Sequence, residues 1–195
     1  MSTNRLIFIS YRRDDSADVT GRIYDRLTAT FGRDAVFKDV DNIPFGVDFR
    51  QHLDHEVRQC QILLAIIGKD WLNANNEQGK RRLDNSADFV RIELESALKR
   101  NIPVIPILVS NAVMPAASQL PESLVDLAYR NGTIVGRDPD FHNHMDRLVN
   151  GIQQLVQSSS SPTKKSNNKQ PEPSSQAIKT QAIELKSEKG VDYTS

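Results

Sequence analysis

The sequence is poor in cysteine, with Cys60 as its one cysteine among 195 residues. One cysteine cannot form an internal disulfide, so nothing in the sequence points to an oxidising compartment. Long apolar runs are also missing, because residues 62–67 and 102–109 are far shorter than the roughly 20 residues that a bilayer-spanning helix needs. The first residues lack the apolar stretch of a signal peptide. We therefore expect a cytoplasmic protein without a membrane partner.

An excess of one sign of charge is absent as well. The 25 basic and 25 acidic residues give a formal net charge of zero, so no overall field would attract nucleic acid or an anionic membrane. The sequence contains no glycine-rich phosphate loop and no G-x-S-x-G motif. Four histidines are present, but neither the pair His52 and His55 nor the pair His142 and His144 has a third ligand nearby in sequence. We expect no metal site and no bound cofactor.

Composition divides the chain near Ser158. Four serines and a proline begin there, and scattered Lys, Asn, Gln, Pro and Glu follow. Such a segment buries too little apolar surface to offset the entropy lost on ordering. We predict one domain over residues 1–157 and a disordered tail or linker over residues 158–195.

Short apolar runs alternate with amphipathic stretches throughout the predicted domain. The runs are typical of buried strands, and the stretches repeat apolar residues every third or fourth position, as helices do. Pro103 and Pro106 indicate limited pairing on one side of the fourth strand, or an irregular stretch there. The expected strands are residues 6–9, 35–37, 62–67, 102–109 and 133–135, and the expected helices are residues 19–31, 49–60, 89–99 and 141–155.

This alternation predicts an α/β fold with a parallel sheet and helices on both faces. Five such strands are consistent with a flavodoxin-like sheet in the order 2-1-3-4-5. Ligands of these sheets bind beyond the carboxyl ends of the strands. In this sequence the polar segments 10–15, 39–46 and 68–71 follow those ends.

Arg12 and Arg13 are the first candidates for ligand binding. Two guanidinium groups at the end of a strand could grip a diphosphate or a carboxylate. The alternative is a solvated turn in which Asp14 and Asp15 neutralise the two arginines. The residues alone leave both interpretations open.

A second candidate is the loop over residues 39–46. Pro44 and Gly46 favour a loop, and Ile43 and Phe45 are apolar residues within it. They either tuck under the domain or form an exposed tip that contacts a partner or closes a pocket.

Glu93 is the third candidate. On a helical wheel starting at Phe89, the apolar residues form one stripe that must face the sheet, and Glu95 lies opposite it. Glu93 lies at the border of the stripe, one turn after Phe89. A partly desolvated carboxylate suits catalysis, although acidic residues near a helix N-terminus also serve structural roles.

Four segments together resemble the motifs of Toll/interleukin-1 receptor (TIR) domains. They match the signature of the first strand, the second strand with its following BB loop, a third helix with an aromatic residue four positions before a glutamate, and the fourth strand. In order, these segments are residues 8–13, 37–46, 88–94 and 101–107. The resemblance covers about residues 5–157 and implies the flavodoxin-like fold.

The resemblance is greatest to the NAD-cleaving branch, which includes bacterial TIR proteins. It implies an NAD hydrolase of signalling or immunity that breaks the nicotinamide–ribose bond once it self-associates, with Glu93 as the catalytic residue. The family motif usually carries tryptophan where Phe89 stands, and phenylalanine keeps the ring face but lacks the indole N–H. The implied substrate-binding residues are Phe8, Ser10, Tyr11, Arg12, Arg13, Asp41, Trp71 and Phe89, and the implied assembly loop is Ile43, Pro44, Phe45 and Gly46.

Two other functions remain open from the residues. A TIR adaptor would signal only by homotypic contact, through the loop around Pro44. A phosphoacceptor receiver domain shares the fold, and Asp14, Asp15, Asp70 and Ser110 mimic its pocket. The fifth strand, however, leads into Gly136 and Arg137 without the lysine of such a pocket.

Overall fold

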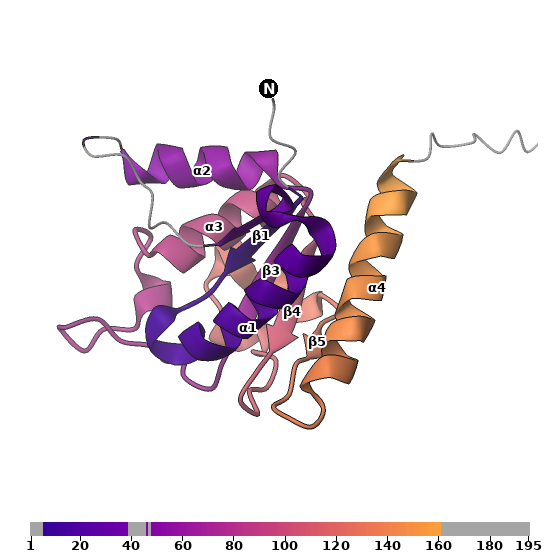
Figure 1. Cartoon of the computed structure of the whole chain (residues 1–195). Helices are drawn as coiled ribbons and strands as arrows, with labels where there is room; N and C mark the ends of the chain where they lie inside the picture. The colour runs from indigo at the N-terminus through magenta and orange to yellow at the C-terminus, as the bar shows by residue number, and fades with distance from the viewer. Residues whose placement is uncertain (1–5, 39–45, 47, 161–195) are drawn as a thin grey trace, which may run out of the picture. The chain divides into compact units, whose positions relative to one another are not determined.

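The computed structural model describes residues 6–38, 46 and 48–160, all within the first of the two units into which the chain divides, Met1–Ser160 (Figure 1). The strands are β1 (Ile7–Ser10), β2 (Val36–Lys38), β3 (Ile62–Ile67), β4 (Val104–Leu108) and β5 (Thr133–Ile134). The helices are α1 (Arg13–Phe31), α2 (Phe49–Gln59), α3 (Phe89–Lys99) and α4 (Phe141–Ser160). Short 3-10 helices span Arg33–Ala35 (η1), Arg82–Asp84 (η2), Ala117–Gln119 (η3) and Glu122–Tyr129 (η4).

The five strands form a parallel sheet in the order β2-β1-β3-β4-β5, which confirms the predicted flavodoxin-like fold. β4 pairs with β3 along its whole length but with β5 only at Ile107 and Leu108. Pro106, which has no N–H to donate, pairs with Ala65 of β3 and lies just before the short β5 pairing begins. The predicted restriction of pairing by the prolines is therefore confirmed on the β5 side.

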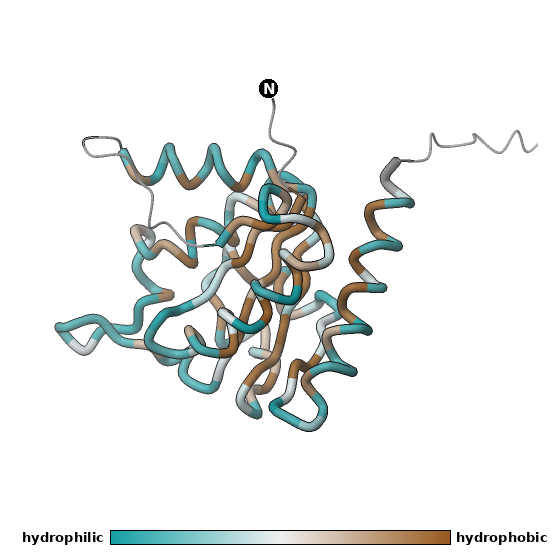
Figure 2. Tube along the Cα trace, in the orientation of Figure 1, coloured by the Kyte–Doolittle hydropathy of each residue, from teal (hydrophilic) through white to brown (hydrophobic). Residues whose placement is uncertain are grey.

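The helices cover both faces of the sheet. Successive side chains of a strand point to opposite faces, so each strand contributes residues to both cores. Ile7 and Ile9 of β1 pack in one core with α1 and α4, and Phe8 between them packs in the other core with α2 and α3. Figure 2 shows apolar strands flanked by helices in which apolar and hydrophilic residues alternate along the helix. Complete burial of each such large apolar side chain stabilises the folded protein by about 1.5–3 kcal/mol.

Most helix boundaries agree with the predicted ones. α3 spans the predicted residues, and Gly32 follows the last residue of α1, as expected of a C-terminal glycine. α1 begins six residues before the predicted start because a first turn at Arg13 is joined to the main helix across a non-helical Ser16. α4 continues to Ser160 and so includes the first three residues of the segment predicted as a tail.

The sequence pattern predicts no helix or strand for the segment between β4 and β5. It contains η3 and η4 in place of a long helix, and Leu124 and Leu127 of η4 are fully buried in the core on the α3 side. The short 3-10 turns lack the long 3.6-residue periodicity that reveals an α-helix in a sequence.

Several predicted features lie outside the described residues. These are Asp41, Ile43, Pro44 and Phe45 of the second loop, and residues 161–195 of the predicted tail. Gly46 is described and has a φ of 83°, a left-handed conformation that favours glycine. Within residues 6–38 and 48–160, no helix is both long and apolar enough to cross a membrane.

Candidate functional site

The N-terminus of α3 lies at the edge of the sheet where ligands of this fold bind. α3 connects β3 to β4, so it begins beside the carboxyl ends of the parallel strands. Asp88 caps the helix by accepting a hydrogen bond from the backbone N–H of Arg91 at 3.1 Å. The cap sets the first turns of α3, where Phe89 and Glu93 follow each other on one face.

Glu93 is more deeply buried than the helical wheel predicted. Glu93 is only 4% exposed. The helix that carries it, α3, contacts β1 and β4 of the sheet and the neighbouring α2. Glu95, expected to be solvated, is half-buried and accepts hydrogen bonds from Arg91 Nε at 2.6 Å and from the Ser123 hydroxyl at 2.5 Å. The two glutamates therefore differ: Glu95 joins a surface network, and Glu93 is enclosed where a charge acts more strongly than in water.

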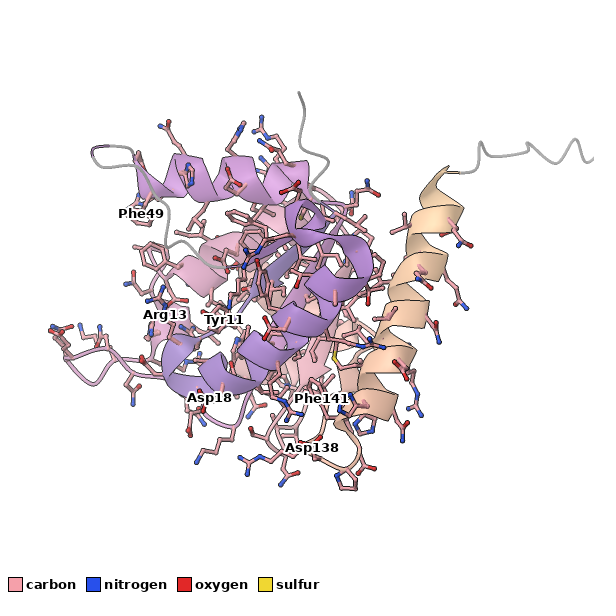
Figure 3. All side chains as sticks on the ribbon, in the orientation of Figure 1. Tyr11, Arg13, Asp18, Phe49, Asp138 and Phe141 are labelled. Atoms are coloured by element: carbon pink, nitrogen blue, oxygen red, sulfur yellow. The ribbon has the colours of Figure 1, made fainter. Side chains whose placement is uncertain are left out.

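Phe89 is 40% exposed and forms an aromatic pair with Phe49, the first residue of α2. The ring centroids are 4.9 Å apart and the planes meet at 87°, an edge-to-face arrangement. Figure 3 shows Phe49 at the start of α2. The sequence predicted Phe49 only as part of a helical stripe. Its position next to the polar loop 39–46 was the one signal that it belonged to the site edge.

Arg12 is buried, and protein groups bind its guanidinium. Nη1 and Nη2 donate to the two carboxylate oxygens of Asp88 at 2.9 and 3.0 Å, and Nε donates to the backbone carbonyl of Trp71 at 3.1 Å. The guanidinium also lies 5.9 Å from the centre of the Trp71 ring. Neither Asp14 nor Asp15 provides these acceptors, so Arg12 is not the solvated arginine of the alternative interpretation.

The other residues of the first-strand motif are distributed over both faces of the sheet. Phe8 and Ser10 are buried on the α3 side, Phe8 with its ring centroid 5.7 Å from that of Phe37. Among the described residues, the Ser10 hydroxyl is one of four buried polar side-chain groups with an atom that has no hydrogen-bond partner. Tyr11 packs against the core under α1 and α4, and Arg13 is exposed.

The turn after β3 is held against the start of α1 by Asp15. Its carboxylate accepts hydrogen bonds from the backbone N–H groups of Gly68 and Asp70, both at 2.9 Å. A Cβ atom at position 68 would overlap that carboxylate, so glycine allows the close approach and a larger residue would displace the Asp15 side chain. Trp71, which ends the turn, is 0% exposed, so a ligand would reach its ring only after a rearrangement.

A hollow of about 550 Å³ opens on the α1 side of the same edge. Side chains of both charge signs surround it, and Arg22 and Asp138 at its wall form an ion pair at 3.0 Å. Figure 3 shows Asp138 and Phe141 apart from Phe49, in agreement with two separate regions of the edge. The charged residues of the lining are Arg13, Asp14, Asp15, Asp18, Arg22, Arg137 and Asp138.

The described part of the chain offers no residues for metal binding and no reactive cysteine. No three His, Cys, Asp or Glu side chains there are grouped so that they could hold a metal ion. Burial raises the pKa of the Cys60 thiol to about 12, so this cysteine stays protonated and does not act as a nucleophile. Cys60 is buried in the core on the side of α2 and α3.

Comparisons with known proteins identify a family and two similar proteins. The family model described as TIR domain matches residues 7–149. A relative, "NAD(+) hydrolase sarm1" of Drosophila melanogaster, is 24% identical over 152 residues, which are 77% of this chain and 10% of that protein. The chain thus spans a small part of the relative's length. Among solved structures, TIR domains of the activated Roq1 resistosome, which directly recognises the pathogen effector XopQ, align at 13% identity with a TM-score of 0.49 over 80% of this chain and 99% of that one.

Proposed function

This chain belongs to the TIR-domain family, and from that premise we propose that it cleaves NAD at the bond between nicotinamide and ribose. Glu93 is the catalytic carboxylate of the proposed reaction. One observation carries the proposal: a buried glutamate follows an exposed aromatic residue by one helical turn, at the ligand-binding edge of the sheet. The sarm1 relative, which is named an NAD(+) hydrolase, supports the choice of substrate.

The proposed chemistry needs few protein groups. Loss of nicotinamide leaves a ribose with oxocarbenium character, as in glycoside hydrolysis. A fixed carboxylate stabilises this developing cation, or orients the ribose hydroxyls, without a metal. Nicotinamide departs as a neutral molecule and needs no general acid. A single enclosed glutamate is therefore sufficient for this bond cleavage.

The aromatic pair supplies a surface for the substrate's planar rings. Phe89 is half-exposed and Phe49 packs edge-on against it, which fixes the orientation of the Phe89 ring. A flat nicotinamide or adenine ring stacks on such a surface without a hydrogen bond. Arg13, which is exposed, offers a positive charge near the same edge for the diphosphate.

The direct test measures nicotinamide release from NAD by the full chain at high protein concentration. Glu93→Gln keeps the size of the side chain but removes its charge, and it should lower release by about 100-fold or more, as expected when a group that stabilises charge in the transition state is lost. Glu95→Gln is the matched control on the same helix and should retain release within about twofold, because Glu95 belongs to a surface network. Equal release by wild type and Glu93→Gln, or none by wild type when self-associated, contradicts the proposal.

The products of the same reaction refine the proposal. Hydrolysis adds water to the ribose and gives linear ADP-ribose, whereas attack by a nucleophilic atom of the same nucleotide gives a cyclic product that lacks this water. Mass spectrometry separates the two products by the mass of one water, and chromatography against standards separates cyclic products that differ only in their linkage. A Glu93→Gln protein that keeps full signalling in cells would instead favour a non-enzymatic adaptor.

We also propose that activity requires self-association. Support comes from a second hollow, of about 570 Å³, where the edge of the sheet at β4 and β5 meets α4. Its lining includes Leu148, Ile152 and Leu155, and Leu155 is 38% exposed. Leu148 and Ile152 are buried, so Leu155 is the apolar side chain of this hollow that a second copy of the chain would cover. Leu155→Asp should reduce both the oligomer measured by light scattering and nicotinamide release; a change in neither contradicts this part.

A further inference from the structure

Asp88 connects more elements at the candidate site than any cap requires. Its two carboxylate oxygens each accept two hydrogen bonds. Oδ1 accepts from Arg12 Nη2 and from the Arg91 backbone N–H, at 3.0 and 3.1 Å. Oδ2 accepts from Arg12 Nη1 and from Arg82 Nε, at 2.9 and 3.1 Å. One side chain thus joins the end of β1, the loop before α3 and the first turn of α3.

The Arg12–Asp88 pair is buried, with side-chain exposures of 0% and 2%. A helix cap needs only an oxygen that accepts from the first turn, and serine, threonine or asparagine would provide it. Burying two charges has a large desolvation penalty, so a buried ion pair is weak evidence for stability as its purpose. The two-pronged contact between carboxylate and guanidinium does, however, fix direction as well as distance.

We propose that Asp88 and Arg12 are positioning residues that hold the first two turns of α3, and with them Glu93, against the end of β1. The inference rests on the proposed NAD cleavage for its effect on rate, but not for its effect on the helix. Arg12 in turn is held by the carbonyl of Trp71, and the turn that contains Trp71 is held by Asp15. These linked hydrogen bonds fix the position of the first turn of α3 relative to the end of β1. Arg12 is then a support for the catalytic residue and not a contact for NAD.

Steady-state kinetics separate positioning from binding and from stability. Asp88→Asn retains the shape and a capping oxygen but loses the charge. Arg12→Lys retains the charge but loses the two-pronged contact. Each should lower kcat by about 10- to 100-fold, the range expected when reacting groups move by about 1 Å. KM for NAD should change by less than about threefold, because neither residue touches the substrate.

Asp54→Asn is the matched control. Asp54 holds the other end of α3, accepting from the Ser96 hydroxyl at 2.7 Å and from Arg100 Nη2 at 2.8 Å. This variant should lower stability while leaving kcat within about twofold, because its partners Ser96 and Arg100 lie in the second half of α3, beyond the first turn that Asp88 caps. Equal losses of kcat in Asp88→Asn and Asp54→Asn would overturn the proposal, because both would then reflect general destabilisation.

Hydrogen exchange tests the positioning without any activity. The amide of Arg91 is bonded to Asp88, so Asp88→Ala should speed its exchange by about tenfold or more relative to amides in the middle of α3. Arg12→Lys, which keeps the cap, should speed exchange in the same turn by a smaller factor. Unchanged exchange in both variants overturns the proposal. If wild-type protein releases no nicotinamide while exchange responds as expected, the proposed function fails and the helix-holding role of Asp88 stands.

Discussion

The two ends of α3 are held by the same chemical pair in different surroundings. At the first end, Asp88 binds Arg12 with side-chain exposures of 2% and 0%; at the last end, Asp54 binds Arg100 with exposures of 35% and 27%. The buried pair lies at the N-terminal end of α3, before the turns that carry the proposed catalytic residue, and the half-exposed pair lies where α3 leads into β4. The difference indicates that burial of charge accompanies the proposed site and is not a general device for attaching this helix.

The energies expected at the two ends differ accordingly. A half-exposed ion pair adds about 0–1 kcal/mol, because water screens it and two long side chains lose freedom. A buried pair adds little net stability but is expensive to break, since removing one partner leaves an uncompensated charge. Substitutions at the two ends should therefore separate clearly in unfolding experiments.

The largest effect is expected from Arg12→Ala. It leaves the buried Asp88 carboxylate with fewer donors, and the free energy of unfolding should fall by about 3–5 kcal/mol. Urea unfolding followed by circular dichroism measures the change. Arg26→Ala, at the exposed pair with Asp146, should lower the same quantity by less than about 1 kcal/mol. Similar losses in the two variants would remove the contrast between buried and exposed pairs.

A smaller effect is expected from Gly68→Ala, behind the first end of α3. The added methyl group would overlap an oxygen of Asp15, so that carboxylate must move and release the N–H groups of Gly68 and Asp70. We expect a loss of about 1–2 kcal/mol in the free energy of unfolding, the usual net contribution of two hydrogen bonds, because the two N–H groups are only partly buried or exposed. The double variant Gly68→Ala with Asp15→Ala should lose less than the two single variants together, because the clash is gone. Strict additivity would show that the methyl group and Asp15 do not meet.

The smallest effect, expected from Asp54→Asn, depends on pH. Burial by itself would raise the pKa of Asp54, but the hydrogen bond from Ser96 and the charges of Arg100 and Arg58 outweigh it and hold that pKa below its ordinary value of 3.8. The ionised form therefore stabilises the fold above the unfolded pKa, and this stability is lost as the pH falls through the lowered folded pKa. At pH 7 the free energy of unfolding of the variant should be about 0.5–1 kcal/mol lower than that of the wild type. This difference should disappear as the pH is brought well below 3.8. A gap that persists in acid would assign the effect to packing instead of charge.

Much of the fold was predictable from the sequence, because local patterns determine it. The apolar run of β3 and the stripe of α3 each carry their own periodicity, and their alternation leaves few topologies. The site was predictable only in part. The wheel marked Glu93 but underestimated its burial, since burial depends on α2 and the sheet packing around α3.

The partners of charged residues could not be predicted from neighbouring positions. Arg12 has Asp14 and Asp15 close by in sequence, yet its partner Asp88 is 76 residues away. Asp15 instead bonds to backbone N–H groups 53 and 55 residues away. Likewise the contact between Phe49 and Phe89 joins the starts of two helices. Such pairings follow from the packed fold and have no local pattern that would reveal them.

Trp71 gives this protein an optical probe at the first end of α3. It is the one tryptophan of the chain, its side chain is buried, and its backbone carbonyl accepts from Arg12. Its emission should therefore be that of an indole shielded from water and poorly quenched by acrylamide. Any ligand or association that loosens the Arg12–Asp88 pair should shift this emission to longer wavelength, so a single fluorescence trace can follow the state of the site in the unmodified protein.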